Sequence, residues 1–343
     1  MLKRTMTTQA SLMNQHLLED YLRHVGATLP AEEFCKVVSD YYHEIESVYY
    51  DQVHQEIFEN ETVVAWRAAL QAAKPFLPNR LRVLDIGCGT GFAAQTVLQT
   101  LGSDRVDQMV CIDPSQHMLT ICERKLALHP CAKRFLHANI AQLLEQNSGF
   151  DLIVSNSVLH HVFALGVFLR DLDRALAPGG IYICGHEPSE RHYKITEIKK
   201  WNRRFNWYMR LRGALKVKRT LKRALSGMGI IARATNLSEK VNESLLAEGH
   251  ATTPLAANAI QKMVDIHVPQ SYGEYLWGQP GFSPETLLIQ YLRCYTTIFN
   301  ATYHHLKAPF HLLGCYWRHV NNRLKRDYPD GGADIIMAFR KSS

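Results

Sequence analysis

The stretch from Val83 to Gly91, VLDIGCGTG, constrains the fold more than any other part of this chain. A short apolar run leads into three glycines at alternate positions, and an apolar helical segment follows from Phe92 to Leu101. Glycine is needed where the backbone turns tightly or lies close to a ligand. The unpaired N–H groups at the start of the next helix face the same crevice. The pattern therefore predicts a ligand-binding loop between a buried strand and a helix.

Short apolar runs recur along the chain and alternate with helical segments. Each run is nearly continuous rather than alternating in polarity, which is typical of strands buried on both faces of a parallel sheet. We therefore predict an α/β, Rossmann-like fold with a seven-stranded, mostly parallel sheet and helices on both faces. The predicted strands are 82–87, 108–113, 134–139, 151–156, 181–186, 294–305 and 334–340.

Helical sequence before and within this alternation divides the chain into four parts. Apolar residues at helical spacing before the first strand predict an N-terminal helical lid over residues 1–75. Residues 76–190 form the predicted α/β core, and residues 191–283 form a helical insertion after the fifth strand. Strand character returns in residues 284–343, which we expect to complete the core sheet.

Two kinds of cofactor compete for the glycine loop. Residues 89–94, with Asp113 after the next strand, also satisfy the dinucleotide pattern, in which an acidic residue binds a ribose. However, Asp85 stands at the end of the first strand, and Gly87 adds a glycine that the dinucleotide pattern lacks. A carboxylate pointing into the loop would repel a pyrophosphate, whereas it could bind the ammonium group of an amino acid. These residues favour a cofactor that carries an amino acid over NAD.

An acidic residue followed by GxGxG resembles the first motif of the class I S-adenosylmethionine-dependent methyltransferases, and the resemblance continues from about residue 80 to 187. In that family the residue at Asp113 binds both ribose hydroxyls, and the residue at Met118 packs on adenine. Asn139 matches the residue that bonds the adenine amino group, where many members have Asp. The resemblance implies S-adenosylmethionine as the cofactor, held by Asp85, Gly87, Cys88, Gly89, Gly91, Asp113, Pro114, Met118, Asn139, Ile140, Ser155 and, from the preceding helices, Tyr50.

Residues 155–161 resemble the family segment that flanks the reactive methyl group. His160 and His161 therefore stand where a base could take a proton from an acceptor, and an unperturbed histidine titrates near ~6.5. We prefer His160; the alternative is that both histidines only cap a helix or bond the backbone. His186 and Glu187 end the fifth strand and are further candidate acceptor contacts. No HxxEH or HExxH spacing occurs, so we expect no metal site.

The positive charge of the chain is concentrated in one block. Between Ile198 and Ser238 there are twelve Lys and Arg and no Asp or Glu, within a chain of formal net charge +7. Aromatic residues in the block follow helical spacing, which predicts an amphipathic helix with a basic face in solvent. An acidic carrier or another anionic partner at 199–223 is the second interpretation. Nucleic acid is the least favoured partner, because the sequence has no recognisable RNA-binding module.

Composition indicates which class of protein this is and where it is located. Hydrophobic residues make up 46% and charged residues 21%, as in ordinary globular proteins. No apolar run reaches the ~18 residues of a transmembrane helix, and the N-terminus lacks the apolar stretch of a signal peptide, so we expect a cytoplasmic protein with no membrane span. The eight cysteines form no CxxC pair, which indicates neither a disulfide framework nor a zinc knuckle.

Three functions remain open at this point. The first is S-adenosylmethionine-dependent methyl transfer to a small molecule, for example in specialised metabolism. The second is an S-adenosylmethionine-consuming enzyme without methyl transfer, which would be an intramolecular cyclase, a lyase or an aminocarboxypropyl transferase that releases methylthioadenosine. The third is a non-enzymatic subunit that retains the fold. The intact loop from Asp85 to Gly91, together with Asp113, argues against the third.

Overall fold

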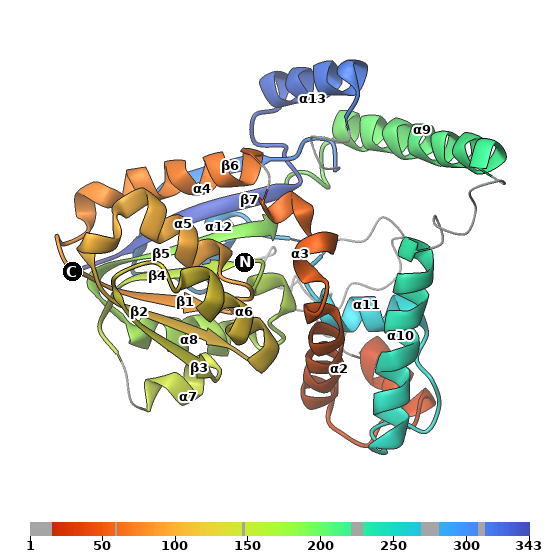
Figure 1. The fold of residues 1–343 in the computed structure, drawn as a ribbon, viewed down its shortest axis with the longest axis horizontal. Helices are drawn as coiled ribbons and strands as arrows, with labels where there is room; N and C mark the ends of the chain where they lie inside the picture. Colours follow the sequence, from red (N-terminus) through yellow and green to blue (C-terminus); the bar gives the residue numbers. More distant parts are fainter. Residues whose placement is uncertain (1–15, 59, 146–147, 221–228, 269–280, 308–312) are drawn as a thin grey trace, which may run out of the picture.

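A seven-stranded sheet forms the centre of the molecule, and a group of helices lies beside the carboxyl ends of its parallel strands (Figure 1). The sheet was predicted from the apolar runs, and the fold is the expected Rossmann-like α/β architecture. This computed structural model describes residues 16–58, 60–145, 148–220, 229–268, 281–307 and 313–343.

The strand order is β3-β2-β1-β4-β5-β7-β6. Strands β1 to β5 run parallel, and β7 is antiparallel to both of its neighbours. The order reverses between β1 and β4, and ligands bind at such switch points, beyond the carboxyl ends of the strands. The strands are β1 Leu81–Ile86, β2 Val106–Asp113, β3 Ala132–His137, β4 Phe150–Asn156, β5 Leu176–Pro188, β6 Tyr295–Tyr303 and β7 Asp334–Lys341.

Helices cover both faces of the sheet because successive strand residues point to opposite sides. Val83 packs into the layer formed with α4, α5 and α6, whereas Leu84 packs into the layer formed with α7, α8 and α12. Figure 1 shows α4 and α5 above the sheet and α7 and α8 below it. These helices are α4 Asn60–Ala73, α5 Phe92–Leu101, α6 Gln116–Leu126, α7 Ile140–Leu144, α8 Leu165–Ala175 and α12 Pro284–Gln290.

The segment that we predicted as one lid divides into two parts. Trp66 on α4 is fully buried, and its Nε1 donates to Asn156 Oδ1 on β4 at 2.9 Å. Helix α4 therefore belongs to the core, which the sequence did not predict. Helices α2 (Ala31–Ser47) and α3 (Tyr50–Val53) instead lie beside the carboxyl ends of the strands (Figure 1).

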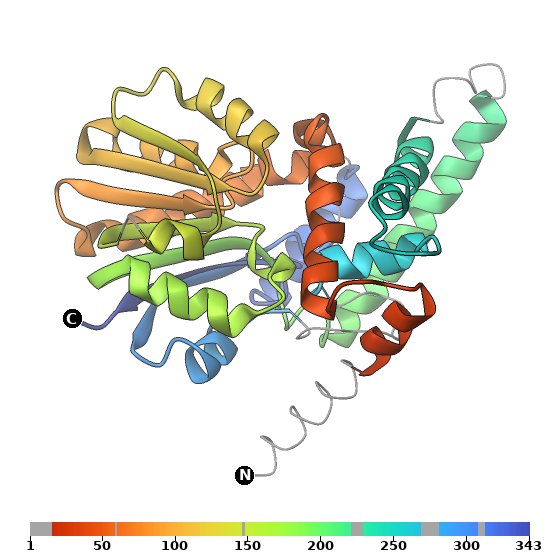
Figure 2. The same ribbon diagram turned by 90° about the horizontal axis from the view of Figure 1, so that it is seen from below.

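The predicted helical insertion also divides into two parts. Helices α10 (Gly229–Ala247) and α11 (Ala257–Val264) share an apolar cluster with α2 and the preceding helical residues 16–24. Figure 2 shows α2 standing between the sheet and α10. This helical group forms one wall beside the switch point.

Helix α9 (Thr196–Thr220) carries the basic block and packs against α13 (Cys315–Asp327) (Figure 1). Phe205 is buried against Trp317, with ring centroids 5.0 Å apart, while its basic neighbours are exposed. The described part of α9 therefore has the predicted apolar face and basic outer face. Side chains of 213–223, the remainder of that block, lie outside the described residues. Across the described ranges, no helix combines the length and apolar character that crossing a membrane requires.

Candidate active site

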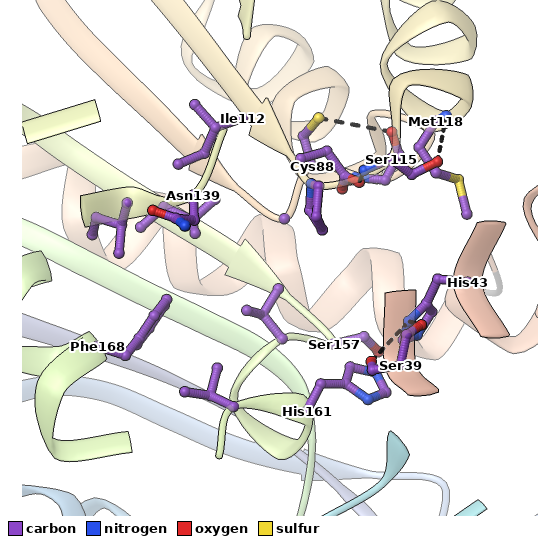
Figure 3. A pocket seen from close by; sticks show the side chains of 18 of the residues that line it. Ser39, His43, Cys88, Ile112, Ser115, Met118, Asn139, Ser157, His161 and Phe168 are labelled. Carbon is purple, nitrogen blue, oxygen red and sulfur yellow. Dashed lines mark hydrogen bonds between the residues drawn. The ribbon is translucent and has the colours of Figure 1, made fainter. Parts of the chain in front are cut away.

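A cavity of about 430 Å³ lies at the switch point of the sheet. The turns after β1, β2, β3 and β4 form its floor and sides, and helix α2 closes another side. In Figure 3, His43 of α2 and His161 lie across the cavity from Cys88 and Met118, and Asn139 lies at its far end. The cavity therefore occupies the place where the sequence predicted cofactor binding.

The glycine loop is shaped by three left-handed residues, as its sequence predicted. Gly87 has φ +60°, and a Cβ there would lie 2.7 Å from Val158 Cγ2. Gly91 has φ +91°, and a Cβ there would lie 2.9 Å from Cys122 Sγ. At Gly89 no atom lies within 4 Å of the Cβ position, so the backbone is open toward the cavity. Gly91 does not line the cavity itself; it is the residue from which α5 begins.

Asp85 is fully buried at the end of β1 and lines the cavity. Its Oδ2 accepts a hydrogen bond from the Ala94 N–H at 2.9 Å, whereas Oδ1 has no hydrogen-bond partner among the described residues. Burial raises the pKa of Asp85 well above its usual range. A buried carboxyl oxygen without a donor is costly, so this site suits a cationic group such as an ammonium.

Asp113 ends β2 at the same cavity. Its Oδ2 accepts from the Gly89 N–H and its Oδ1 from the Ser115 N–H, each at 2.8 Å. Burial raises the pKa of Asp113 to about 6, against the effect of these two donors. Each carboxylate oxygen has a second lone pair, so Asp113 can still accept from a vicinal diol.

Ten of the twelve predicted cofactor residues line this cavity, and Gly91 and Ser155 do not. Ser155 is fully buried, and its hydroxyl is 2.8 Å from Tyr182 Oη in the interior between β4 and β5. Asn156 and Ser157 are the residues of this strand end that line the cavity instead, so the prediction for Ser155 is corrected to its neighbours. The predicted residues that line the cavity are Asp85, Gly87, Cys88, Gly89, Asp113, Pro114, Met118, Asn139, Ile140, Tyr50 and His161.

Asn139 has a second role that its sequence position alone left open. It precedes α7, and its Oδ1 accepts from the Gln142 N–H at 3.0 Å while the Gln142 side chain accepts from the Asn139 N–H. This is a capping box, which satisfies two donors at the helix start. Asn139 therefore both caps α7 and presents its amide at the cavity.

Polar contacts hold α2 and α3 against the core, and no sequence motif predicted them. Ser115 Oγ donates to Glu44 Oε2 on α2 at 3.0 Å. Thr90 Oγ1, inside the glycine loop, donates to Asp51 Oδ1 at 2.7 Å, and Lys125 Nζ donates to Asp51 Oδ2 at 2.5 Å. The helices that close the cavity are therefore linked directly to the loop and to α6.

A second cavity, of about 240 Å³, adjoins the first. The two share five lining residues, among them Tyr50, Ser157 and His161. The second cavity is rich in polar side chains from separate parts of the chain. They are Tyr42, His43, Glu46, His54, His160, His186, Tyr193, Gln261, Asp265, Lys307 and Asp334.

His160 lines this second cavity and is held by the fully buried Glu187. Glu187 Oε2 lies 2.7 Å from His160 Nδ1. The same carboxyl group accepts from three successive backbone N–H groups, those of Val158, Leu159 and His160, at 2.8, 2.9 and 3.2 Å. These donors favour an ionised carboxylate, while burial raises the pKa of Glu187 to about 7. With Glu187 ionised, Nδ1 carries the imidazole proton and Nε2 is left as an acceptor.

The histidines around the junction of the cavities are neutral at physiological pH. Burial lowers the pKa of His160 to about 4 and that of His161 to about 3. Burial and the neighbouring His161 lower the pKa of His43 to about 4. His161 Nδ1 lies 2.8 Å from the Val264 carbonyl oxygen and therefore donates to it. Both predicted histidines thus present neutral rings whose Nδ1 is already bonded.

Comparisons with known proteins agree with this geometry. A family model described as a methyltransferase domain matches residues 84–182. An uncharacterised methyltransferase of Mycobacterium bovis is 34% identical over 98 residues, which cover 29% of this chain and 46% of that protein. A ubiquinone biosynthesis O-methyltransferase of Azorhizobium caulinodans is 29% identical over 103 residues, which cover 30% of this chain and 39% of that protein. The chain thus spans less than half the length of these curated relatives.

Among solved structures, a complex between the Haloferax volcanii Trm112 methyltransferase activator and a methyltransferase aligns over 88% of this chain and 98% of that chain, with 12% identity and a TM-score of 0.47. The matched residues 84–182 run from the glycine loop to the middle of β5 and contain Asp85 and Asp113. Residues 84–182 are therefore similar to a methyltransferase domain, and they lie in a Rossmann-like sheet.

Proposed function

We propose that this protein is an S-adenosylmethionine-dependent methyltransferase that acts on a small, polar molecule. The observation that carries the proposal is the pair of buried carboxyl groups at one cavity. Asp85 has an oxygen without a donor, and Asp113 keeps acceptor capacity on both oxygens. An amino-acid ammonium and a ribose diol, both present in this cofactor, supply the matching donors.

The cofactor, when bound, supplies a methyl group on a sulfonium that is ready for displacement, so the chain mainly aligns the reactants. Asp85 would hold the ammonium, and Asp113 the ribose hydroxyls. The adenine would lie toward Asn139, with Met118 and Ile140 as apolar contacts. Helices α2 and α3 exclude water from the cavity, because Glu44 and Asp51 hold them on the core.

The second cavity is the proposed acceptor site, because it meets the first at Ser157 and His161. His160 would take a proton from the acceptor at Nε2, with Glu187 as the positioning residue that keeps the proton on Nδ1. The imidazole and carboxyl groups around this cavity suit a polar acceptor. The similarity to the ubiquinone biosynthesis O-methyltransferase of Azorhizobium caulinodans supports a small-molecule substrate.

Incubation of the purified protein with S-adenosylmethionine, alone and with fractions of a metabolite extract, tests the proposal. Liquid chromatography with mass spectrometry would follow both sulfur products. We expect S-adenosylhomocysteine to form only when an acceptor fraction is present, together with a product heavier by one methyl group. Methylthioadenosine formed from the cofactor alone would contradict methyl transfer, and tighter binding of NAD than of S-adenosylmethionine in calorimetry would contradict the cofactor.

A further inference from the structure

Three residues that the proposed reaction does not use meet at one end of three neighbouring strands. His186 lies in β5, His304 directly follows β6, and Asp334 begins β7, the strand between them. Asp334 is in register with Pro188 on one side and with Tyr303 on the other. One ligand atom of each of the three lies within 4.8 Å of the others. Topology therefore builds a compact cluster of two imidazoles and a carboxylate.

The backbone at both histidines is in an unfavourable conformation. His186 has φ +57° and His304 has φ +55°, and among the described residues the third non-glycine residue of this kind is Ser157, with φ +58°. Such residues cost free energy, persist only where the surrounding structure determines them, and gather at functional sites. Ser157 and His186 both line the second cavity. Two of these three residues therefore line the cavity, and both histidines of the cluster have this backbone conformation.

We propose that His186, His304 and Asp334 form a binding site for a divalent transition metal such as zinc. Imidazole nitrogen with a carboxylate is the donor set that zinc, iron, cobalt and nickel prefer, whereas magnesium and calcium prefer oxygen. His304 Nδ1 and Asp334 Oδ2 already lie 2.7 Å apart. A tetrahedral zinc holds such ligand atoms roughly 3.3 Å from one another, so modest side-chain movement would complete the site.

The local charges fit a cation at this place. Asp334 brings a carboxylate to the cluster, and its Oδ2 lies 2.7 Å from His304 Nδ1. Lys307, whose Nζ donates to Tyr193 Oη at 3.3 Å, is the nearby cation that opposes metal binding. Its removal should strengthen the site.

The position of the site gives it a role in acceptor binding, and this step rests on the proposed function. His186 and Asp334 line the same cavity as His160. Three protein ligands leave coordination positions on a zinc ion, which an oxygen or nitrogen atom of the acceptor can occupy. The acceptor class would then be a small molecule with a metal-binding donor atom near the atom that receives the methyl group.

Zinc binding by the whole chain tests the site without any acceptor. Titration calorimetry with Zn²⁺ alone, and visible absorption of the Co²⁺ form, would compare wild type with His186→Asn and His304→Asn. Asparagine tolerates the left-handed backbone, so these variants keep the strand ends. We expect affinity to fall by at least the roughly 10–100-fold that loss of an outer-shell partner causes. Lys307→Met should raise affinity.

His161→Asn is the matched control, because His161 belongs to a second cluster, with His160 and Asp265, at the same cavity. It should leave zinc affinity unchanged, and the His186→Asn and His304→Asn variants should still bind S-adenosylhomocysteine. Unchanged zinc affinity in His186→Asn would overturn the proposal, as would loss of binding in His161→Asn alone. If His304→Asn does not fold, His186→Asn and Lys307→Met decide the question. Failure of metal binding with intact cofactor binding would leave the methyltransferase proposal standing.

Discussion

Replacing Glu187 by glutamine tests the assignment of His160 as the base. One carboxyl oxygen, Oε1, accepts from the Val158 and Leu159 N–H groups, and the other, Oε2, accepts from His160 N–H and faces His160 Nδ1. In glutamine, an NH₂ group takes the place of one of these two carboxyl oxygens. On the Oε1 side it would leave two buried N–H groups without an acceptor; on the Oε2 side it leaves one. The second orientation is therefore preferred, at a cost of about 1–3 kcal/mol of stability.

In that orientation the amide donates to His160 Nδ1, which moves the imidazole proton to Nε2. The ring can then no longer accept a proton from the second cavity, and we expect turnover to fall by the roughly 10²–10⁴-fold that a general base contributes. Cofactor affinity should not change, because Glu187 does not line the first cavity. Nitrogen-15 NMR of labelled histidines at pH 8 reads the tautomer directly, with His160→Gln identifying the signal, and thermal unfolding measures the stability.

Glu190→Gln is the control for this substitution. Glu190 lies a few residues further along, lines neither cavity, and bonds Lys194 and Thr286 instead of a histidine. It should keep the wild-type tautomer and turnover. A folded Glu187→Gln protein with the proton still on Nδ1 of His160, and with wild-type turnover, would refute the reasoning.

Four further outcomes are expected. Asp113→Asn should weaken S-adenosylmethionine binding by about 1–3 kcal/mol in calorimetry. The affinity of the wild-type protein should fall as the pH drops through about 6, where Asp113 gains a proton. An affinity that does not depend on pH would contradict this role of Asp113. Hydrogen exchange in residues 31–53 should slow when cofactor binds, since these helices close the cavity; unchanged exchange beside a protected glycine loop would exclude a cover. Trp66→Ala should cost about 3–5 kcal/mol in denaturant unfolding, and a loss below 1 kcal/mol would contradict a core role for α4. A thiol reagent should modify the exposed Cys294 and Cys315 before the buried cysteines, as peptide mapping would show.

The sheet and the glycine loop could be predicted from sequence because their signals are local. A continuous apolar run identifies a buried strand, and glycines at 87, 89 and 91 identify a backbone that needs positive φ. A local sequence pattern does not show which element packs against the apolar face of an amphipathic helix. Helical spacing in 60–73 shows that α4 has an apolar face, but it does not show that the sheet, rather than a lid, covers it. For this reason the sequence assigned α4 to the lid, whereas the structure places it in the core.

Ser155 was misassigned because its role depends on where strand β4 ends. The strand is buried between the helix layers as far as Ser155, and the cavity begins at the next residue. The sequence placed the cavity-facing role on Ser155, while the strand continues to Asn156 and turns at Ser157 with φ +58°. A left-handed serine has no sequence signal, because glycine or asparagine is the residue expected there.

Sequence spacing rules for metal ligands could not detect the cluster of His186, His304 and Asp334. The expectation of no metal site rested on the absence of HxxEH and HExxH, which bring ligands together on one helix. Here His186 lies in β5, Asp334 begins β7 and His304 follows β6, and the order β5-β7-β6 makes them neighbours. Spacing rules detect ligands that one element brings together; they carry no information about ligands that sheet topology assembles.

The two cavities differ in how much of their lining lies within the stretch that matches known methyltransferases. The match to the methyltransferase domain spans 84–182, which includes Asp85, Asp113 and Asn139 around the first cavity. Most of the second cavity comes from outside that stretch, through α2, α11 and the ends of β6 and β7. Tyr42, Asp265 and Asp334 therefore lie outside the matched stretch. Under the proposed function these residues contact the acceptor, so their chemistry limits which molecules can bind. A search for the acceptor should accordingly begin with small molecules that bind zinc, because this cavity presents histidines and carboxylates together with the apolar Ile57, Val264 and Val268.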